Sequence, residues 1–453
     1  WESVRLKKVH LFRQEKYAIE EVCEKLISVL VAEGLDVEEK KVYLAPGWES
    51  ISNGEAVNTH PAVVIGAALA FHRMGAEVTV GENLLPGVSV MERLMSPIQR
   101  ELLKGCARIK PCSQSDYVVV KIRNPIARKE FRIPREWFKA DIAVALPKIK
   151  TNIFCDLATS SWCIVNLAEK GDRAGMMDDL FSMKMADLSR TRPPDIVIAD
   201  GVVAGEGQGP LHPDPVPMGM LVIGRAVSTD AVCAHLAGLE AHYIDHLRFL
   251  AEHGIGSVDV NSIAVNAPEL LKQRDFKKAS WTIENFSERV CVHGGSAKFC
   301  PSGCVGIIRQ ALDASASVVN GMGRDVHLVV GEPVELGEFV LGEGTVLIGD
   351  CTENYKGKGA FVPGRSPEPE SVELAILRSL KDGLSLYGNL RIGLLGLLGA
   401  PGSLKILTVR KQKIKDSAGA TVPGSFVSRL VVSYMAARIK YFFMGIMKKW
   451  FLE

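Results

Sequence analysis

Short apolar runs alternate with helical segments through the first half of the chain, and this alternation constrains the fold more than any other feature of the sequence. The runs that we predict to be strands cover residues 9–12, 41–45, 77–80, 117–120, 141–146, 195–199 and 220–223. The helical segments cover residues 18–33, 61–74, 230–239 and 242–253. Because strands separated by helices usually pair in parallel, with helices on both faces, we expect an α/β fold with a mostly parallel, doubly wound sheet.

A polar stretch at residues 272–288 predicts the end of this first domain, which we place at residues 1–276. Two further apolar runs follow at 327–330 and 345–349, with helical segments at 305–312 and 369–380. These elements predict a second, smaller α/β domain at residues 277–384. Residues 385–453 form a C-terminal extension of different composition.

The extension is basic, whereas the rest of the chain is acidic. Residues 385–453 hold eleven Lys and Arg against two acidic residues, which gives this segment a net charge of +9. Because the whole chain has a net charge of +2, the remaining residues carry −7. Residues 423–453 are predicted to form one amphipathic helix that mixes basic and aromatic side chains. Such a helix fits an anionic membrane surface. It equally fits packing on its own domain or on a second copy of the chain, as in a homodimer, and both interpretations stay open.

Composition excludes several other classes of protein. No uncharged run reaches the ~18 residues that a membrane-spanning helix requires, and no recognised nucleic-acid module accompanies the basic charge. The residues after Trp1 show no export signal, and the chain contains ten cysteines. We therefore expect a reducing compartment, the cytoplasm, with peripheral contact to the inner face of the membrane if residues 423–453 bind lipid.

Four cysteines, Cys291, Cys300, Cys304 and Cys351, come late in the chain. Cys304 opens a predicted helix, where the positive end of the helix dipole favours a thiolate. Cys351 follows a predicted strand, and strand ends and helix starts share one edge of an α/β sheet. This placement predicts a metal or iron–sulfur site of Cys300, Cys304 and Cys351, with Cys291 as a further candidate ligand. The alternative is that these cysteines are small buried hydrophobic residues.

A second group of polar residues follows a predicted strand of the first domain. Lys148, Lys150 and Asn152 come directly after the run 141–146. Such side chains can hold an anion through charge-assisted hydrogen bonds, so we predict that they bind a small anionic substrate. The alternative is that the lysines are simply solvated.

The run 195–199 ends in Asp200 and is followed by a segment that contains Gly205, Glu206, Gly207 and Gly209. We predict a loop whose glycines expose backbone N–H groups to a ligand or cofactor, with Asp200 and Glu206 as acid–base groups or metal ligands. A plain turn is the alternative. His60, before Pro61, and Asp230 are predicted to be helix caps.

The order of these segments resembles the family of uncharacterised proteins known as domain of unknown function 362. The resemblance covers about residues 40–265 and is carried by THP at 59–61, LPKIKT at 146–151, DIVIADG at 195–201, GEGQGP at 205–210 and STDAV at 228–232. Members are mostly bacterial and archaeal, and many are described as iron–sulfur proteins. Similar sequences often have histidine at Asn152, lysine at Val165 and a Cys-Pro pair at Arg365-Ser366. Some carry a ferredoxin insertion that is missing here.

Two functions follow from these observations. The first is an enzyme, an iron–sulfur or other metal-dependent oxidoreductase or lyase, that performs redox or Lewis-acid chemistry on a small anionic substrate in a cleft between the two domains. A four-iron cluster held by three cysteines would leave one iron for substrate. The second is a non-catalytic protein that carries a metal or cluster and docks partners at the membrane surface. A nucleophilic Cys304 with His293 as its base is a third interpretation.

Overall fold

The computed structural model describes residues 6–380 apart from short gaps. The gaps are residues 50–53, 83–89, 113–115, 177, 179, 281, 282, 284, 285, 295–303, 320–324, 332–335, 337–339, 343, 365, 366 and 368. Cys300 and the predicted helix at 423–453 therefore lie outside the described residues.

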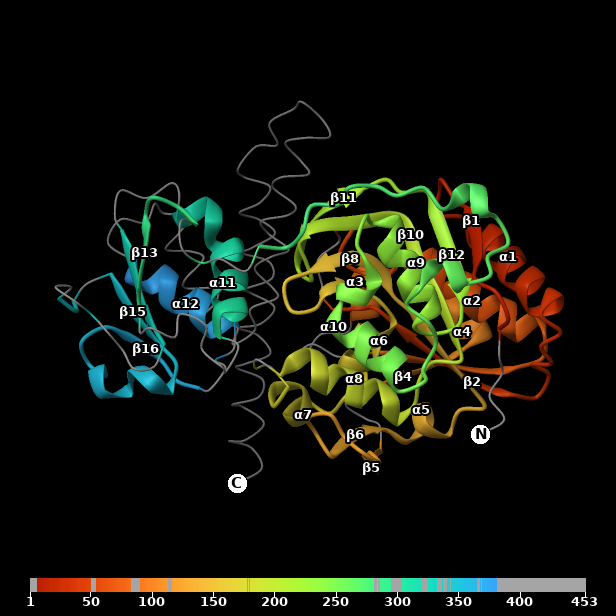
Figure 1. The fold of residues 1–453 in the computed structure, drawn as a ribbon, viewed down its shortest axis with the longest axis horizontal. Coiled ribbons are helices and arrows are strands. Elements are labelled where there is room, and N and C mark those ends of the chain that lie inside the picture. Colours follow the sequence, from red (N-terminus) through yellow and green to blue (C-terminus); the bar gives the residue numbers. More distant parts are fainter. Residues whose placement is uncertain are drawn as a thin grey trace, which may run out of the picture. The chain divides into compact units, whose positions relative to one another are not determined.

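The main sheet is mixed and mostly parallel (Figure 1). Its path runs β1 (His10–Arg13), β12 (Met220–Gly224), β10 (Ile196–Gln208), β7 (Ile142–Leu146), β2 (Lys41–Pro46), β3 (Glu77–Glu82) and β4 (Arg108–Pro111). The strands from β10 to β4 are parallel, whereas β12 and β1 add on antiparallel. Every residue of β7 is buried, which requires cover on both faces of the sheet. The predicted α/β class is confirmed.

Ten α-helices of the described residues accompany the first part of the chain. They are α1 (Ile19–Ala32), α2 (Pro61–Arg73), α3 (Val90–Leu94), α4 (Pro97–Cys106), α5 (Arg135–Lys139), α6 (Ser160–Leu167), α7 (Lys170–Ala174), α8 (Phe181–Thr191), α9 (Ser228–Leu236) and α10 (Asp245–Glu252). α1 and α2 approach closely at Gly66, where a Cβ atom would lie 2.8 Å from Val22. α2 begins where the sequence predicts, because Pro61 occupies the first turn and the side chain of His60 caps it.

A second, smaller sheet lies later in the chain. Its four parallel strands follow the order β13 (Val290–Gly294), β14 (Val326–Val330), β15 (Thr345–Ile348) and β16 (Ala360–Val362). Two helices, α11 (Cys304–Val319) and α12 (Pro369–Ser379), accompany it (Figure 1). The predicted strands at 327–330 and 345–349 and the helices at 305–312 and 369–380 are thus found.

The segment after β7 differs from the prediction. The sequence left open that its lysines are solvated, but residues 148–152 form a buried strand, β8 (Lys148–Asn152), which pairs with β10 and with β9 (Asp156–Ala158). The predicted strand at 117–120 is β5 (Tyr117–Lys121), and among the described strands it pairs with β6 (Glu130–Pro134) alone, in a separate two-stranded sheet. Its half-exposed residues fit a two-stranded ribbon better than a central strand.

The glycine-rich segment also differs, because it is a strand rather than a loop. β10 continues through Gln208 and pairs antiparallel with β11 (His212–Val216). Its glycines allow close packing of the backbone against β8. A Cβ atom on Gly205 would lie 3.0 Å from the Cβ atom of Lys150, and one on Gly209 would lie 1.8 Å from the carbonyl oxygen of Thr151. A side chain at either position would collide with β8, so glycine is required here by the close approach of two backbones.

None of the helices in the described part of the chain combines the length and the apolar character that crossing a membrane requires.

His246 on α10 ties the stability of this fold to pH. It is fully buried, and both ring nitrogens lack a hydrogen-bond partner among the described residues. Burial lowers its pKa to about 4. Between this value and the unfolded value of about 6.5 the unfolded chain binds more protons, so stability is lost as the pH falls.

We therefore expect the free energy of unfolding to fall by about 2 kcal/mol between about pH 7 and about pH 5 through His246 alone. His246→Leu should remove this part of the pH dependence, as measured by urea denaturation at both pH values. His242→Gln is the matched control, because His242 is exposed. An equal pH dependence in His246→Leu and the unmodified protein would contradict the assignment.

Candidate functional site

A buried ion pair joins strands β8 and β10 of the main sheet. Lys148 and Asp200 are register partners on these parallel strands. The Nζ atom of Lys148 lies 2.6 Å from Oδ2 of Asp200, and both side chains are fully shielded from solvent. Taking two charges out of water is expensive, so such a pair persists only where further hydrogen bonds satisfy both groups.

Tyr17 supplies the main part of that satisfaction. Its hydroxyl donates to Oδ1 of Asp200 over 3.2 Å and accepts from Nζ of Lys148 over 2.9 Å. The backbone N–H of Val203 also donates to this hydroxyl, over 3.1 Å, and the carbonyl of Val203 accepts from Lys148 over 3.0 Å. Asp200 further accepts the backbone N–H of His60 over 2.9 Å. Tyr17 thus joins the segment between β1 and α1 to the centre of the sheet.

His60 is the half-buried end of this network. Its ring stacks on the ring of Tyr17, with centroids 3.6 Å apart and planes 12° apart. Its Nδ1 atom accepts the backbone N–H of Ala62 over 3.1 Å and so caps α2, which confirms the predicted cap. Because Nδ1 is an acceptor, the hydrogen of the neutral ring is on Nε2. No partner of Nε2 is found in the described part of the chain.

The pKa values in this network follow from burial. Burial lowers the pKa of His60 to about 4, an effect that Asp200 opposes, so the imidazole is uncharged near neutral pH. Burial lowers the pKa of Lys148, against the attraction of Asp200. Burial raises the pKa of Tyr17 far above its usual range, and the charge of Asp200 adds to the rise. Tyr17 is therefore a hydrogen-bond donor and not a base.

Lys150 makes a second buried ion pair, two residues further along β8. Its Nζ atom lies 2.9 Å from Oε1 of Glu49 and also donates to the carbonyls of Val57 and Pro210. Burial raises the pKa of Glu49, although Lys150 opposes the rise. The indole N–H of Trp162 also opposes the rise as a hydrogen-bond donor to Glu49, although its geometry is not that of a regular hydrogen bond.

The remaining predicted residues of the first domain divide into two groups. Asn152 lies on the same face of β8 as Lys148 and Lys150, because alternate residues of a strand share a face. Its Oδ1 accepts the N–H of Phe154 over 2.7 Å, while its buried Nδ2 lacks a partner in the described part of the chain. Glu206 instead pairs with Lys277, over 3.2 Å, so the structure does not place it with Asp200.

Asp230 is a cap, but not of its own helix. It lies in the first turn of α9, whose start has no side-chain cap. Its carboxylate accepts the backbone N–H and the hydroxyl of Ser160, at the start of α6. Burial raises its pKa to about 6, although the hydrogen bonds from Ser160 oppose the rise.

Two of the four candidate cysteines lie near Gly349, at the end of β15 in the four-stranded sheet. A Cβ atom on Gly349 would lie 3.4 Å from the sulfur of Cys351 and 3.9 Å from the sulfur of Cys304. Cys291 is the second residue of β13 and is in register with His327, which itself pairs with the first residue of β15. This places Cys291 toward the opposite edge of the sheet from Cys351. Among the described residues, which exclude Cys300, no three Cys, His, Asp or Glu side chains are grouped as a metal site.

Comparison with known proteins identifies the part of the chain that holds the buried ion pairs. Residues 42–235 match the family model described as Domain of unknown function (DUF362). This chain carries a DUF362 domain. The domain includes both ion pairs and Asn152, His60 and Glu206, whereas Tyr17 and the candidate cysteines Cys291, Cys304 and Cys351 lie outside it.

Two further similarities are more limited. A thylakoid-associated protein of Synechocystis is 26% identical over 103 residues, which is 20% of this chain and 30% of that protein. The lactate racemase apoprotein of Thermoanaerobacterium thermosaccharolyticum is similar in structure with a TM-score of 0.34 and 10% identity, over 83% of this chain and 82% of that one. Neither similarity assigns an activity to the DUF362 domain.

The sequence does not point to Tyr17, Glu49 or the contact of His60 with Asp200. Tyr17 follows β1 in a segment without a motif, and its role depends on the fold bringing β1, β8 and β10 together. For the contact of His60 with Asp200 the sequence does hold a signal. His60 precedes a helix that starts with proline, and the N-terminal end of a helix favours a negative charge such as that of Asp200.

A double-mutant cycle tests whether Lys148 and Asp200 act as one unit. Lys148→Met and Asp200→Asn should each lower the free energy of unfolding by about 3 kcal/mol or more, because each leaves an uncompensated buried charge. The double variant should lose at least about 1 kcal/mol less than the sum of the two losses. Urea denaturation measures all four proteins, and strictly additive losses would show that the two charges are independent.

Proposed function

We propose that this protein is an enzyme that transfers a proton on a small substrate whose anionic or carbonyl oxygen binds at His60. The proposal rests on one observation, the contacts that lead from the buried Lys148–Asp200 pair through Tyr17 to the half-buried ring of His60. Buried, mutually hydrogen-bonded groups with shifted pKa values are concentrated at functional sites.

His60 acts as an uncharged hydrogen-bond donor in this proposal. Its Nε2–H is the polar group of the network that is left for a ligand, since Nδ1 is occupied by Ala62. It also lies at the first turn of α2, where the helix dipole favours negative charge. A fixed neutral donor at this place stabilises charge that develops on a substrate oxygen during proton removal.

The base in this proposal is Glu55. Its side chain is exposed, and its charge acts on both His60 and Tyr17, in each case after the larger effects of burial and of Asp200. A carboxylate near the donor would take the proton from the carbon next to the substrate carbonyl, while the electron pair moves to the oxygen at His60. This is the reaction class that the arrangement fits best.

Lys148, Lys150 and Asp200 take positioning roles in this reaction. Both lysines are already paired with carboxylates, so we assign contact with the substrate oxygen to His60 and the N-terminus of α2. Asp200 holds the backbone of His60, and Lys148 holds Asp200 and Tyr17. The substrate remains a small anionic molecule in this proposal.

Deuterium exchange tests the proposal directly. Incubated in D₂O with 2-oxobutyrate or 2-oxoglutarate, the protein should exchange the protons next to the carbonyl, as followed by proton NMR. His60→Gln should slow the exchange by about 100-fold, because a preorganised donor is lost. Exchange should also be lost near pH 4, because a proton on Nδ1 of His60 ends its bond to Ala62.

The matched control is His72→Gln, an exposed histidine near the other end of the same helix, which should exchange at the unmodified rate. Circular dichroism confirms that each variant is folded. Exchange at the uncatalysed rate with both acids, or equal rates in His60→Gln and the unmodified protein, would overturn the proposal.

A metal or iron–sulfur centre is a second proposal, supported by the approach of Cys304 and Cys351 to one another at Gly349. Thiolate sulfur is the donor that such a centre needs, and Cys304 lies at the first position of α11, where the helix dipole favours a thiolate. With Cys300 as third ligand, the centre would supply redox or Lewis-acid chemistry. The cleft between the two domains stays a prediction.

Metal analysis of anaerobically prepared protein tests this second proposal. We expect bound iron and sulfide and a broad absorbance near ~400 nm. Cys304→Ala and Cys351→Ala should lose most of the iron, whereas Cys233→Ala, a buried cysteine of the main domain, should keep it. Iron-free, colourless protein after reconstitution would rule the centre out.

Docking at an anionic membrane surface through residues 423–453 remains a proposal, because that segment lies outside the described residues. A relative of this chain over 103 residues is named a thylakoid-associated protein.

A further inference from the structure

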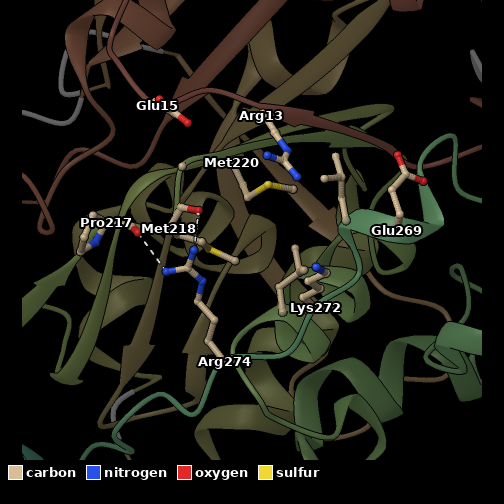
Figure 2. A pocket seen from close by; sticks show the side chains of 11 residues that line it. Arg13, Glu15, Pro217, Met218, Met220, Glu269, Lys272 and Arg274 are labelled. Carbon is tan, nitrogen blue, oxygen red and sulfur yellow. Dashed lines mark hydrogen bonds between the residues drawn. The ribbon is translucent and has the colours of Figure 1, made fainter.

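A pocket of about 340 Å³ opens beside β1 and β12, apart from the Lys148–Asp200 network (Figure 2). Its walls come from the end of β1 at Arg13, the turn before β12, the end of α9 and the segment at 269–274. In the sheet, Met220 is opposite Gly201, the residue directly after Asp200. The packing of Met218 on Gly201 and Ile149 places the turn before β12 on the face of the sheet opposite to Asp200 and Lys148.

The walls of this pocket are fixed by hydrogen bonds. In the turn before β12, the N–H of Gly219 donates to the carbonyl of Val202 over 3.0 Å, and its carbonyl accepts from Gln14 over 2.8 Å. Arg274 donates to the carbonyls of Pro217 and Met218 over 2.9 and 3.0 Å. Its own backbone N–H binds the carbonyl of Leu236. A pocket built on fixed walls loses little conformational entropy when a ligand binds.

Three cationic groups line this pocket, and none of them forms an ion pair with a described residue. Arg274 binds only the two carbonyls, and the charged ends of Arg13 and Lys272 have no hydrogen-bond or ion-pair partner in the described part of the chain. Figure 2 shows the guanidinium of Arg13 directed into the pocket from the β1 side and Lys272 entering from the facing segment. Glu15 and Glu269 also line the pocket, so three positive charges face two negative ones, yet neither carboxylate forms an ion pair with any of the three cationic groups among the described residues. Grouped cations left in this state favour an anion.

Part of the inner surface of the pocket is apolar. It is made by the side chains of Met218, Met220 and Leu236, which are buried beneath the charged groups, together with Leu270. Methionine sulfur is polarizable and adapts to different aliphatic shapes. A hydrated inorganic ion leaves such a surface uncovered, whereas a short hydrocarbon group covers it and gains the free energy of apolar burial.

We propose that this pocket binds a small organic anion that has a phosphate or carboxylate head and a short aliphatic body. The head lies between Arg13 and Lys272, and the body lies on Met218 and Met220. The volume corresponds to about eleven water molecules at ~30 Å³ each, which suits a ligand of roughly a dozen non-hydrogen atoms. A soluble molecule of this size fits the pocket whole, so we assign a soluble ligand rather than a membrane lipid.

Isothermal titration calorimetry on the full chain tests the proposal with hexyl phosphate, inorganic phosphate and hexanol as probes. Hexyl phosphate should bind clearly more tightly than either of the other two, because only it uses both parts of the pocket. Arg13→Gln and Lys272→Gln should each weaken binding by about tenfold or more, the usual loss for a hydrogen bond to a charged group. Lys8→Gln, an exposed lysine that does not line the pocket, should leave the affinity unchanged.

Arg13 and Lys272 are both exposed, so their replacement should preserve the fold, and thermal unfolding checks this. The charge-conserving double variant Arg13→Lys/Lys272→Arg should keep most of the affinity. Absence of hexyl phosphate binding, equal binding of inorganic phosphate, or an unchanged affinity in Arg13→Gln/Lys272→Gln would each overturn the proposal. Flotation with phosphatidylglycerol vesicles that requires Arg13 and Lys272 would overturn the assignment to a soluble ligand.

Discussion

The buried pair of Lys148 and Asp200 sets the conditions for the rest of the main domain. Two charges without access to water are tolerable only with near-complete hydrogen bonding. Tyr17, the carbonyl of Val203 and the backbone of His60 provide it. The turn after β1, the start of α2 and the middle of β10 are therefore held in one arrangement, which a purely apolar contact would fix less strictly.

The same need for hydrogen-bond partners explains how charged side chains can be buried on β8. Lys148, Lys150 and Asn152 share one face of β8, and each lysine meets its own carboxylate. Ile149, on the other face, packs into the apolar cluster around α9. One strand thus separates an electrostatic layer from a hydrophobic layer. His60 and the Arg13 pocket belong to opposite sides of this division, so a ligand at one need not compete with a ligand at the other.

Much of the fold follows from local sequence, and most of the site does not. The apolar runs of β2, β7 and β14 and the Pro61 start of α2 are governed by neighbouring residues, so they can be predicted. The strand β8 cannot, because two lysines in five residues indicate a solvated loop unless their carboxylate partners are known. Glu49 and Asp200 are far from these lysines in sequence. The glycines of β10 mislead for a similar reason, since the strand against which they pack becomes visible only in three dimensions.

The position of Tyr17 has a consequence for how this domain is delimited. The family match begins at residue 42, after β1 and α1, and ends at residue 235. A fragment cut at those limits would lose the hydroxyl that joins Lys148 to Asp200 and the strand that covers β12. The newly exposed edge of β12 would be open to pairing with another chain. The unit that folds as one body is therefore wider than the unit that homology recognises.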